Sequence, residues 1–344
     1  MKNIFLFVLP TLVLSLLTSA LFGQIEDYHD YQKGIHAAEL KLITGEKEEA
    51  LRAYESVLHS SNGNFVKDVY NAAILASELG GNDRLYRLLE LIPAKQLSSK
   101  YLLSLEPFKK HHEEPAWAAF LSKNEAMKPP MPELSKAVRQ LAVDDQYFRT
   151  KPGSYKVYGD TIAQIDSINM AYIFDLISEG TFPSEDVTGV KDIRGNQTVD
   201  ILLHHYCQST SVIKTKPNLT PALINLVLEG KLLPNKCANW LEMQKGDFRA
   251  GVFNVMSFSY GGVRTDWFVP SYGKTDRLLI DQTRMLLGLE PLGEYYQKLL
   301  FIIENPKTPY VFDIRRTIVE VADEAAALGH VGRLVKLKNV ANQR

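Results

Sequence analysis

Apolar and small residues recur at helical spacing through the first third of the chain. Within 29–92 they lie three or four positions apart, and a glycine interrupts the pattern at Gly45 and again at Gly80. Residues with this spacing share one face of a helix, and glycine readily adopts the left-handed conformation that ends a helix. The pattern therefore predicts two helical hairpins, and weaker patterns over 98–108 and 115–127 predict a third pair of helices.

Signals for helix starts and stops are frequent in the second half of the chain. Hydroxyl or acidic residues and prolines stand where helices begin, and glycines such as Gly180, Gly230 and Gly288 stand where they end. The predicted helices run over 166–179, 220–229, 234–243, 274–287, 291–304 and 313–328. Segments 252–259 and 267–272 look strand-like or irregular. We therefore expect a mainly all-α protein with at most a short β or irregular segment.

Three prolines within residues 128–132 interrupt the helical pattern. Each proline fixes φ and removes a backbone donor, so the segment favours a stiff, extended link. We predict a boundary here, with a helical repeat region over 24–127 and a second helical domain over 133–344.

The N-terminus has the order of a secretory signal peptide. A basic residue precedes an apolar run over 4–17, and small residues follow it. Cleavage after Ala20 or Gly23 would release an exported protein, periplasmic or extracellular, and we take 1–23 as the signal peptide. The alternative is an uncleaved anchor helix, since 4–22 is nearly long enough to span a bilayer.

The balance of charged residues excludes one class of binding partner. The 344 residues include 39 Lys and Arg against 40 Asp and Glu, for a formal net charge of -1. This balance argues against a nucleic-acid binder that relies on a broad basic surface. Cys207 and Cys237 could form a disulfide in an oxidising compartment, or both could be buried free thiols.

The first hairpin carries the features of a known repeat. Its stretch 45–58 reads GEKEEALRAYESVL, small residues Ala37 and Ala38 precede it, and Gly45 and Gly80 are 35 residues apart. This resembles the tetratricopeptide repeat, whose period is about 34 residues. The resemblance implies a concave surface for a protein or peptide partner, with Tyr54 as a binding residue. The alternative is a scaffold packed on the second domain, without a ligand of its own.

Six short motifs follow in a fixed order after the prolines. They are Asp145-Gln146-x-x-Arg149, Ile165-Asp166-x-x-Asn169, Gly180-x-Phe182-Pro183, His204-His205, Gly230-x-Leu232-x-Pro234 and Gly288-Leu289-x-Pro291-Leu292. In this order they resemble a bacterial domain family of unknown function, in which the third motif usually reads Gly-Trp-Pro. The resemblance implies homology and supplies no activity.

Candidate catalytic residues lie within these motifs. A pocket lined by Asp145, Asp166 and His204 could activate water, with Arg149 and Asn169 as binding residues. The alternative is structural: Asp166 is a candidate helix N-cap, and Asp145 with Arg149 has the spacing of an ion pair on one helix.

Other chemistry has little support in the sequence. No His-Glu-x-x-His, paired-cysteine or calcium-loop pattern occurs, and neither does a P-loop or a dinucleotide fingerprint, so we predict neither a metal site nor a cofactor. Aromatic residues crowd 253–272, and Trp267 and Tyr272 could line a ligand groove or complete the core.

Our leading expectation is an exported, soluble helical protein that binds an unidentified protein or peptide, with no nucleic-acid partner and no stable membrane insertion after signal cleavage. The alternative is an extracytoplasmic hydrolase or small-molecule-binding protein with its site near Asp145, Asp166 and His204.

Overall fold

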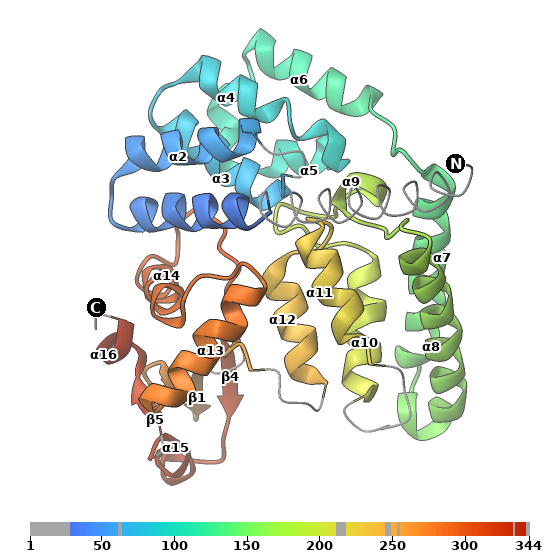
Figure 1. The fold of residues 1–344 in the computed structure, drawn as a ribbon, viewed down its shortest axis with the longest axis vertical. Coiled ribbons are helices and arrows are strands. Elements are labelled where there is room, and N and C mark those ends of the chain that lie inside the picture. The colour runs from blue at the N-terminus through green and yellow to red at the C-terminus, as the bar shows by residue number, and fades with distance from the viewer. Residues whose placement is uncertain are drawn as a thin grey trace, which may run out of the picture.

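The computed structural model describes residues 28–60, 64–210, 218–244, 249–252, 255–332 and 334–341, and within them the protein is mainly helical with one small sheet near the C-terminus (Figure 1). The predicted signal peptide over 1–23 lies outside the described residues. In the part of the chain that is described, no helix is both long enough and apolar enough to cross a bilayer.

The N-terminal helices form the predicted hairpins. A helix over 28–43 is followed by α2 (Lys47–Ser60), α3 (Val66–Glu78) and α4 (Asn82–Leu89). Gly45 and Gly80, at the two predicted turns, have φ of 88° and 75°. A residue with a side chain is strained in this left-handed region, so the glycines are required where they stand. The helical pairing is confirmed, whereas membership of the repeat family stays a prediction.

Shorter helices complete the upper layer in Figure 1. They are η1 (Pro93–Lys95), α5 (Ser99–Ser104), η2 (Glu106–His111) and α6 (Pro115–Ala126). Ser98 caps α5, since its hydroxyl accepts a hydrogen bond from the Tyr101 backbone N–H at 3.2 Å. The third predicted helix pair is therefore present, with a 3₁₀ segment between its members.

A long hairpin of two helices forms one edge of the molecule (Figure 1). Helix α7 (Pro132–Arg149) has proline in its first turn, and α8 (Ser154–Ser178) packs along it. The sequence predicted that α8 would begin at Asp166, and this was wrong. Asp166 lies in the middle of the helix and cannot cap it, because its carboxylate is bound to Arg149 of α7. The predicted stop at Gly180 is confirmed by its φ of 72°.

In the described residues, six more helices follow along the chain before the last part of the sheet. They are α9 (Glu185–Thr188), α10 (Val199–Thr210), α11 (Thr220–Leu228), α12 (Pro234–Met243), α13 (Lys274–Leu286) and α14 (Leu292–Glu304). Helices α11 to α14 lie within a residue or two of their predicted ranges.

The sheet gathers strands from two separate segments. Strands β1 (Met256–Tyr260), β2 (Val263–Arg264) and β3 (Phe268–Pro270) pair antiparallel, β4 (Thr317–Glu320) runs parallel to β1, and β5 (Leu334–Lys336) pairs antiparallel with β3. β1 and β3 lie where strand-like segments were predicted, and β2 lies between those two segments.

The predicted helix over 313–328 was wrong. Residues 313–316 have no regular secondary structure, β4 follows, and the described helices after it are α15 (Glu324–Val331) and α16 (Leu337–Ala341). β4 belongs to a sheet because β1 supplies backbone partners for Thr317 to Glu320, and this long-range pairing outweighs local helical spacing.

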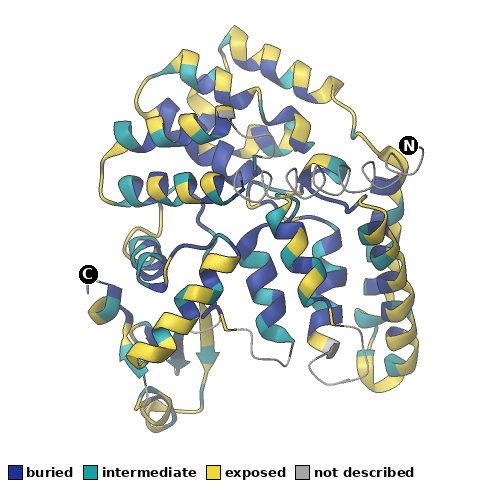
Figure 2. Ribbon diagram, viewed as in Figure 1, coloured by how far each residue is buried: buried dark blue, intermediate teal, exposed yellow. Residues whose placement is uncertain are grey.

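One hydrophobic core runs through both sides of the proline segment. It contains buried side chains from Tyr28 in the first helix to Phe312 after α14. Figure 2 shows the buried positions concentrated where α3, α10 and α12 face the interior, and α3 is buried along nearly its whole length. Cys207 and Cys237 form no disulfide and are both buried in this core, and burial raises the pKa of Cys207 to about 12.

Candidate functional site

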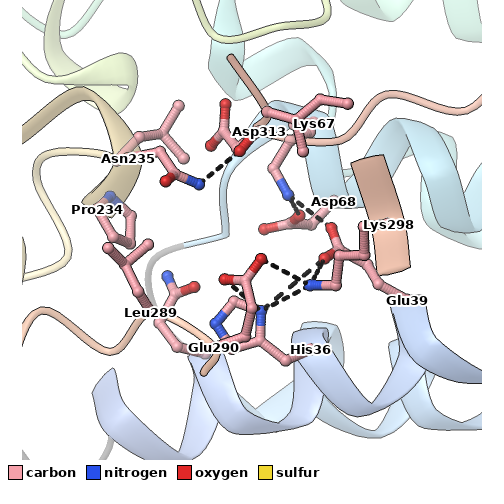
Figure 3. A pocket seen from close by; sticks show the side chains of 13 residues that line it. His36, Glu39, Lys67, Asp68, Pro234, Asn235, Leu289, Glu290, Lys298 and Asp313 are labelled. Carbon is pink, nitrogen blue, oxygen red and sulfur yellow. Dashed lines mark hydrogen bonds and ion pairs between the residues drawn. The ribbon is translucent and has the colours of Figure 1, made fainter. Parts of the chain in front are cut away.

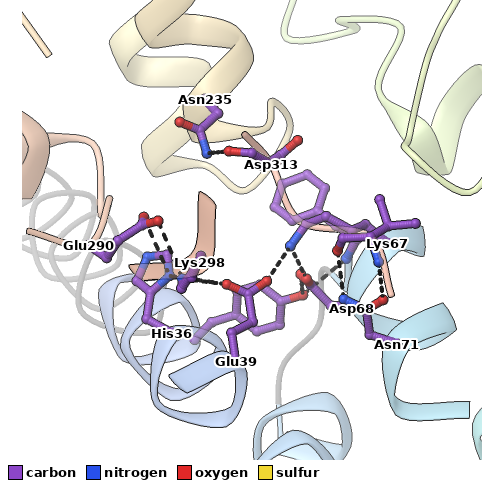
Figure 4. A network of polar contacts seen from close by, with 12 residues as sticks. His36, Glu39, Lys67, Asp68, Asn71, Asn235, Glu290, Lys298 and Asp313 are labelled. Atoms are coloured by element: carbon purple, nitrogen blue, oxygen red, sulfur yellow. Dashed lines mark hydrogen bonds and ion pairs between the residues drawn. The ribbon is translucent and has the colours of Figure 1, made fainter. Parts of the chain in front are cut away.

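Six charged or titratable side chains meet in the centre of the molecule, and we call them the central cluster. They are His36, Glu39, Lys67, Asp68, Glu290 and Lys298 (Figure 4). They come from the first helix, the start of α3, the turn before α14, and α14 itself. The cluster therefore joins the repeat-like helices to the C-terminal part of the chain.

Glu39 is the centre of the hydrogen bonding in the central cluster. Its two carboxylate oxygens accept from Lys298 Nζ at 2.5 Å and from Lys67 Nζ at 3.0 Å. Lys67 also donates to Asp68 at 2.5 Å, and Lys298 lies 3.3 Å from Glu290. Both lysines are buried, with side chains 6% and 1% exposed. Buried ammonium groups are tolerated only when carboxylates surround them in this way.

The lysines keep the carboxylates of the central cluster ionised. Burial by itself would raise the pKa of Glu39, but Lys298 and Lys67 outweigh it and hold the pKa well below the usual value. Burial likewise opposes ionisation of Glu290, yet Lys298 and His36 lower its pKa to about 2. The ion pairs of the central cluster therefore connect the first helix and α3 to α14.

A small cavity of about 20 Å³ lies beside the central cluster (Figure 3). This is close to the space that one water molecule needs. Asn235 of α12 and Asp313 of the segment after α14 complete its wall. The cavity is too small for an organic ligand.

An open pocket of about 260 Å³ lies on the other side of that wall, and we call it the basic pocket. It shares Asn235, Asp313 and Ile314 with the small cavity, and it is lined by three cationic side chains. These are Arg194, Lys236 and Arg315. Among the described residues, Asp313 is the one acidic residue that lines it.

Three separate chain segments place these cations. Arg194 lies in a turn where the Asp192 carboxylate accepts the Arg194 backbone N–H at 2.9 Å. Lys236 stands in the first turn of α12, which Pro234 begins. The backbone of Arg315 is held on both sides by the Tyr295 hydroxyl, which accepts from Arg315 N at 2.9 Å and donates to Arg315 O at 3.2 Å.

The three cations differ in how far their charge is compensated. Lys236 Nζ donates to Asp200 at 2.6 Å and to the carbonyl of Gly195. Arg194 is exposed and has no carboxylate within salt-bridge distance among the described residues. Burial lowers the pKa of Arg315, which shows that its guanidinium is partly removed from water. The Arg315 guanidinium also donates from Nη1 to the side-chain Oδ1 of Asn239. Arg194 is therefore the cation of the pocket that is most open to a ligand.

The residues predicted as a catalytic site are partly brought together. Arg149 lies between the carboxylates of Asp145 and Asp166, with Nη–O distances of 2.9 and 2.6 Å. The histidine against Asp145 is His205, whose Nδ1 is 2.8 Å from its carboxylate. In the described structure no hydrogen bond or ion pair joins His204 to either carboxylate. Burial, then His205 and Arg315, lower the pKa of His204.

The other predicted binding residues are scattered. Asn169 is buried and donates to the Leu141 carbonyl at 3.4 Å. Tyr54 is 0% exposed, so from this position it cannot touch a partner. Trp267 and Tyr272 pack against a small core near the sheet, and the guanidinium of Arg316 lies 5.4 Å from the Trp267 ring centre.

The sequence analysis missed the central cluster and the basic pocket. Their members are far apart along the chain, so no motif spacing could reveal them. One local signal was available: Lys298 falls between Tyr295 and Leu299 on the buried face of α14. A lysine within an apolar helical face indicates a buried partner of opposite charge.

No group of three or more His, Cys, Asp and Glu side chains suited to a metal ion occurs in the described ranges. Comparison with protein-family models, curated proteins and solved structures finds no match to this chain.

Proposed function

We propose that the protein binds a small anionic molecule in the basic pocket. The observation that carries the proposal is the convergence of Arg194, Lys236 and Arg315, from three separate segments, on one open pocket of about 260 Å³. Such a volume corresponds to about nine water molecules at ~30 Å³ each, so the ligand is a small molecule.

The chemistry of arginine supports this choice of ligand. A guanidinium presents a planar fork of donors that matches the oxygens of a carboxylate or phosphate group. Val252 and Phe312 add apolar surface behind the charges, as small-molecule sites commonly have. By contrast, the Asp145 and Asp166 carboxylates are both bound to Arg149, so we base the proposal on the basic pocket.

Calorimetric titration with butyrate and with inorganic phosphate, against neutral butyramide, tests the proposal. We expect at least one anion to bind and the amide to bind far more weakly. Arg194→Gln should weaken anion binding roughly tenfold, because one charge-assisted contact is lost. Arg52→Gln is the matched control, since Arg52 is exposed on α2 and pairs with Glu49. Equal binding of the anions and the amide would refute the proposal.

A second proposal, binding of a peptide partner by the repeat-like region, has its own supporting observation. An open groove of about 530 Å³ lies between the Gly45 turn and the loop after α14. Leu42, Phe301 and Tyr310 give it apolar walls, and Tyr310 donates to Glu78 at its rim. Ile43→Glu should abolish capture of a partner from the extracytoplasmic fraction, whereas Leu79→Glu, an exposed position outside the groove, should not. Equal capture by both variants would exclude the groove.

We also propose that the protein is exported, which the pattern over 1–23 supports. Mass spectrometry of the protein recovered from its own host should give an N-terminus soon after Ala20 or Gly23. Recovery of the intact N-terminus would contradict signal cleavage.

A further inference from the structure

We propose that the ligand of the basic pocket is a small zwitterion, with a protonated amine that binds at Asp313. This inference rests on the proposed anion binding and names the second half of the ligand. It follows from one acidic side chain in the wall of the pocket to which the described residues supply no donor.

This side chain is Asp313. Its backbone carbonyl accepts from Asn235 Nδ2 at 2.7 Å, but within the described ranges no hydrogen bond or ion pair reaches its carboxylate. Two lysines influence it electrostatically, and neither donates to it. Lys67 is directed at Glu39 and Asp68, and Lys236 at Asp200. The carboxylate stands in the wall of the basic pocket without a donor of its own.

Asn235 fixes the backbone beside this carboxylate. Its Nδ2 donates to the Asp313 carbonyl, as Figure 3 shows. The Asp313 carboxylate is accessible from an open pocket whose other charged side chains are cationic. An acidic side chain without an ion pair in such a pocket points to a ligand that carries a positive charge as well as a negative one.

The two parts of the basic pocket therefore demand opposite charges from one ligand. Arg194 and Arg315 favour an anionic group, while Asp313 would repel a second one. A simple anion satisfies the arginines and leaves the Asp313 carboxylate without a donor. A molecule with both an anionic group and an ammonium group satisfies both parts, because the ammonium carries three donors and a positive charge.

Matched pairs of ligands separate these cases by titration of the full mature chain. The pairs are glycine with acetate, 4-aminobutyrate with butyrate, and 6-aminohexanoate with hexanoate, and 4-hydroxybutyrate is added as a neutral donor. We expect at least one amino acid to bind tenfold or more tightly than its matched carboxylate, since the extra contact is charge-assisted. The hydroxy acid should fall between the two.

Asp313→Asn tests the assigned residue. The variant keeps the shape of the side chain and removes its charge, so the preference for the amino acid should fall to near one while the carboxylate still binds. Asp266→Asn, at an exposed carboxylate paired with Lys336 near the sheet, should leave the preference unchanged.

The outcomes distinguish this inference from the proposed function. If each amino acid and its matched carboxylate bind equally to the wild type, the zwitterion is excluded while anion binding stands. If the hydroxy acid binds as tightly as the amino acid, the ammonium assignment is wrong. If no member of any pair binds, the proposed function itself fails. The wild-type comparison decides the inference even if Asp313→Asn does not fold.

Discussion

The Glu185 carboxyl group makes the stability of the folded protein depend on pH. It is 3% exposed, one oxygen accepts the backbone N–H of Val66 at 2.8 Å, and the other has no hydrogen-bond partner in the described structure. Burial raises its pKa to about 7, although Lys95 acts in the opposite direction. The folded state therefore binds this proton more tightly than the unfolded chain does.

Replacing Glu185 with Gln should flatten the pH dependence of stability. The stabilising effect of the protonated group is complete below the unfolded pKa of about 4.5 and is lost as pH rises through about 7. Between about pH 4 and pH 8 the wild type should lose on the order of 3 kcal/mol relative to Glu185→Gln, measured by urea unfolding. Parallel curves for the two proteins would show that the group titrates normally.

Lys298 is a residue whose loss should be severe. Its side chain is 1% exposed and compensates Glu39 and Glu290. Lys298→Met leaves buried negative charge without a partner, which costs about 3–5 kcal/mol in unfolding free energy.

A second substitution separates charge from packing at this position. Adding Glu290→Gln to Lys298→Met removes part of the excess negative charge, so the double variant should be more stable than the sum of the two single variants predicts. Additive losses in urea unfolding would mean that packing of the lysine, and not its charge, stabilises the central cluster.

At the scale of elements, α8 buries polar side chains and exposes an isoleucine. Its buried side includes Asp166, Asn169 and Ile173, while Ile168 is 59% exposed. The ion pair between Arg149 and Asp166 requires Asp166 to face α7. Ile168, two residues further along the helix, then faces solvent. Apolar spacing predicted the helix over 166–179, but the apolar character of Ile168 does not tell which side of the helix is buried.

Two isoleucines of α8 provide a matched test of this orientation. Ile173→Ala should cost about 2–5 kcal/mol because it leaves a cavity in the core, and Ile168→Ala should change stability by less than about 0.5 kcal/mol. The measurement is the midpoint of urea unfolding. The reverse order would mean that the helix is rotated.

The sequence predicted those elements that are determined by neighbouring residues and missed those that depend on distant parts of the chain. Pro234 begins α12 and Gly288 ends the helical pattern after α13 through backbone geometry, so both boundaries were predictable. β4 depends on pairing with β1, some 60 residues earlier in the chain, and was missed. The basic pocket is less local still, since Arg194 and Arg315 meet only through the tertiary fold.

For the molecule as a whole, the core shared by both sides of residues 128–132 should make unfolding cooperative. In a Trp117→Phe/Trp267→Phe variant, fluorescence reports Trp240 in α12, and far-UV circular dichroism reports all helices. We expect the two urea curves to superimpose, because the core and the central cluster link the two parts. Separate midpoints would show that the two parts unfold independently.

The two buried cysteines allow the rate at which the core opens to be measured. A thiol reacts with iodoacetamide as the thiolate, and burial both hides Cys207 and Cys237 and keeps them protonated. Alkylation of the native protein should therefore proceed only as fast as the core around α10 and α12 opens. Adding urea should accelerate labelling in step with the loss of stability, so the mass gained over time measures the opening rate without any introduced probe.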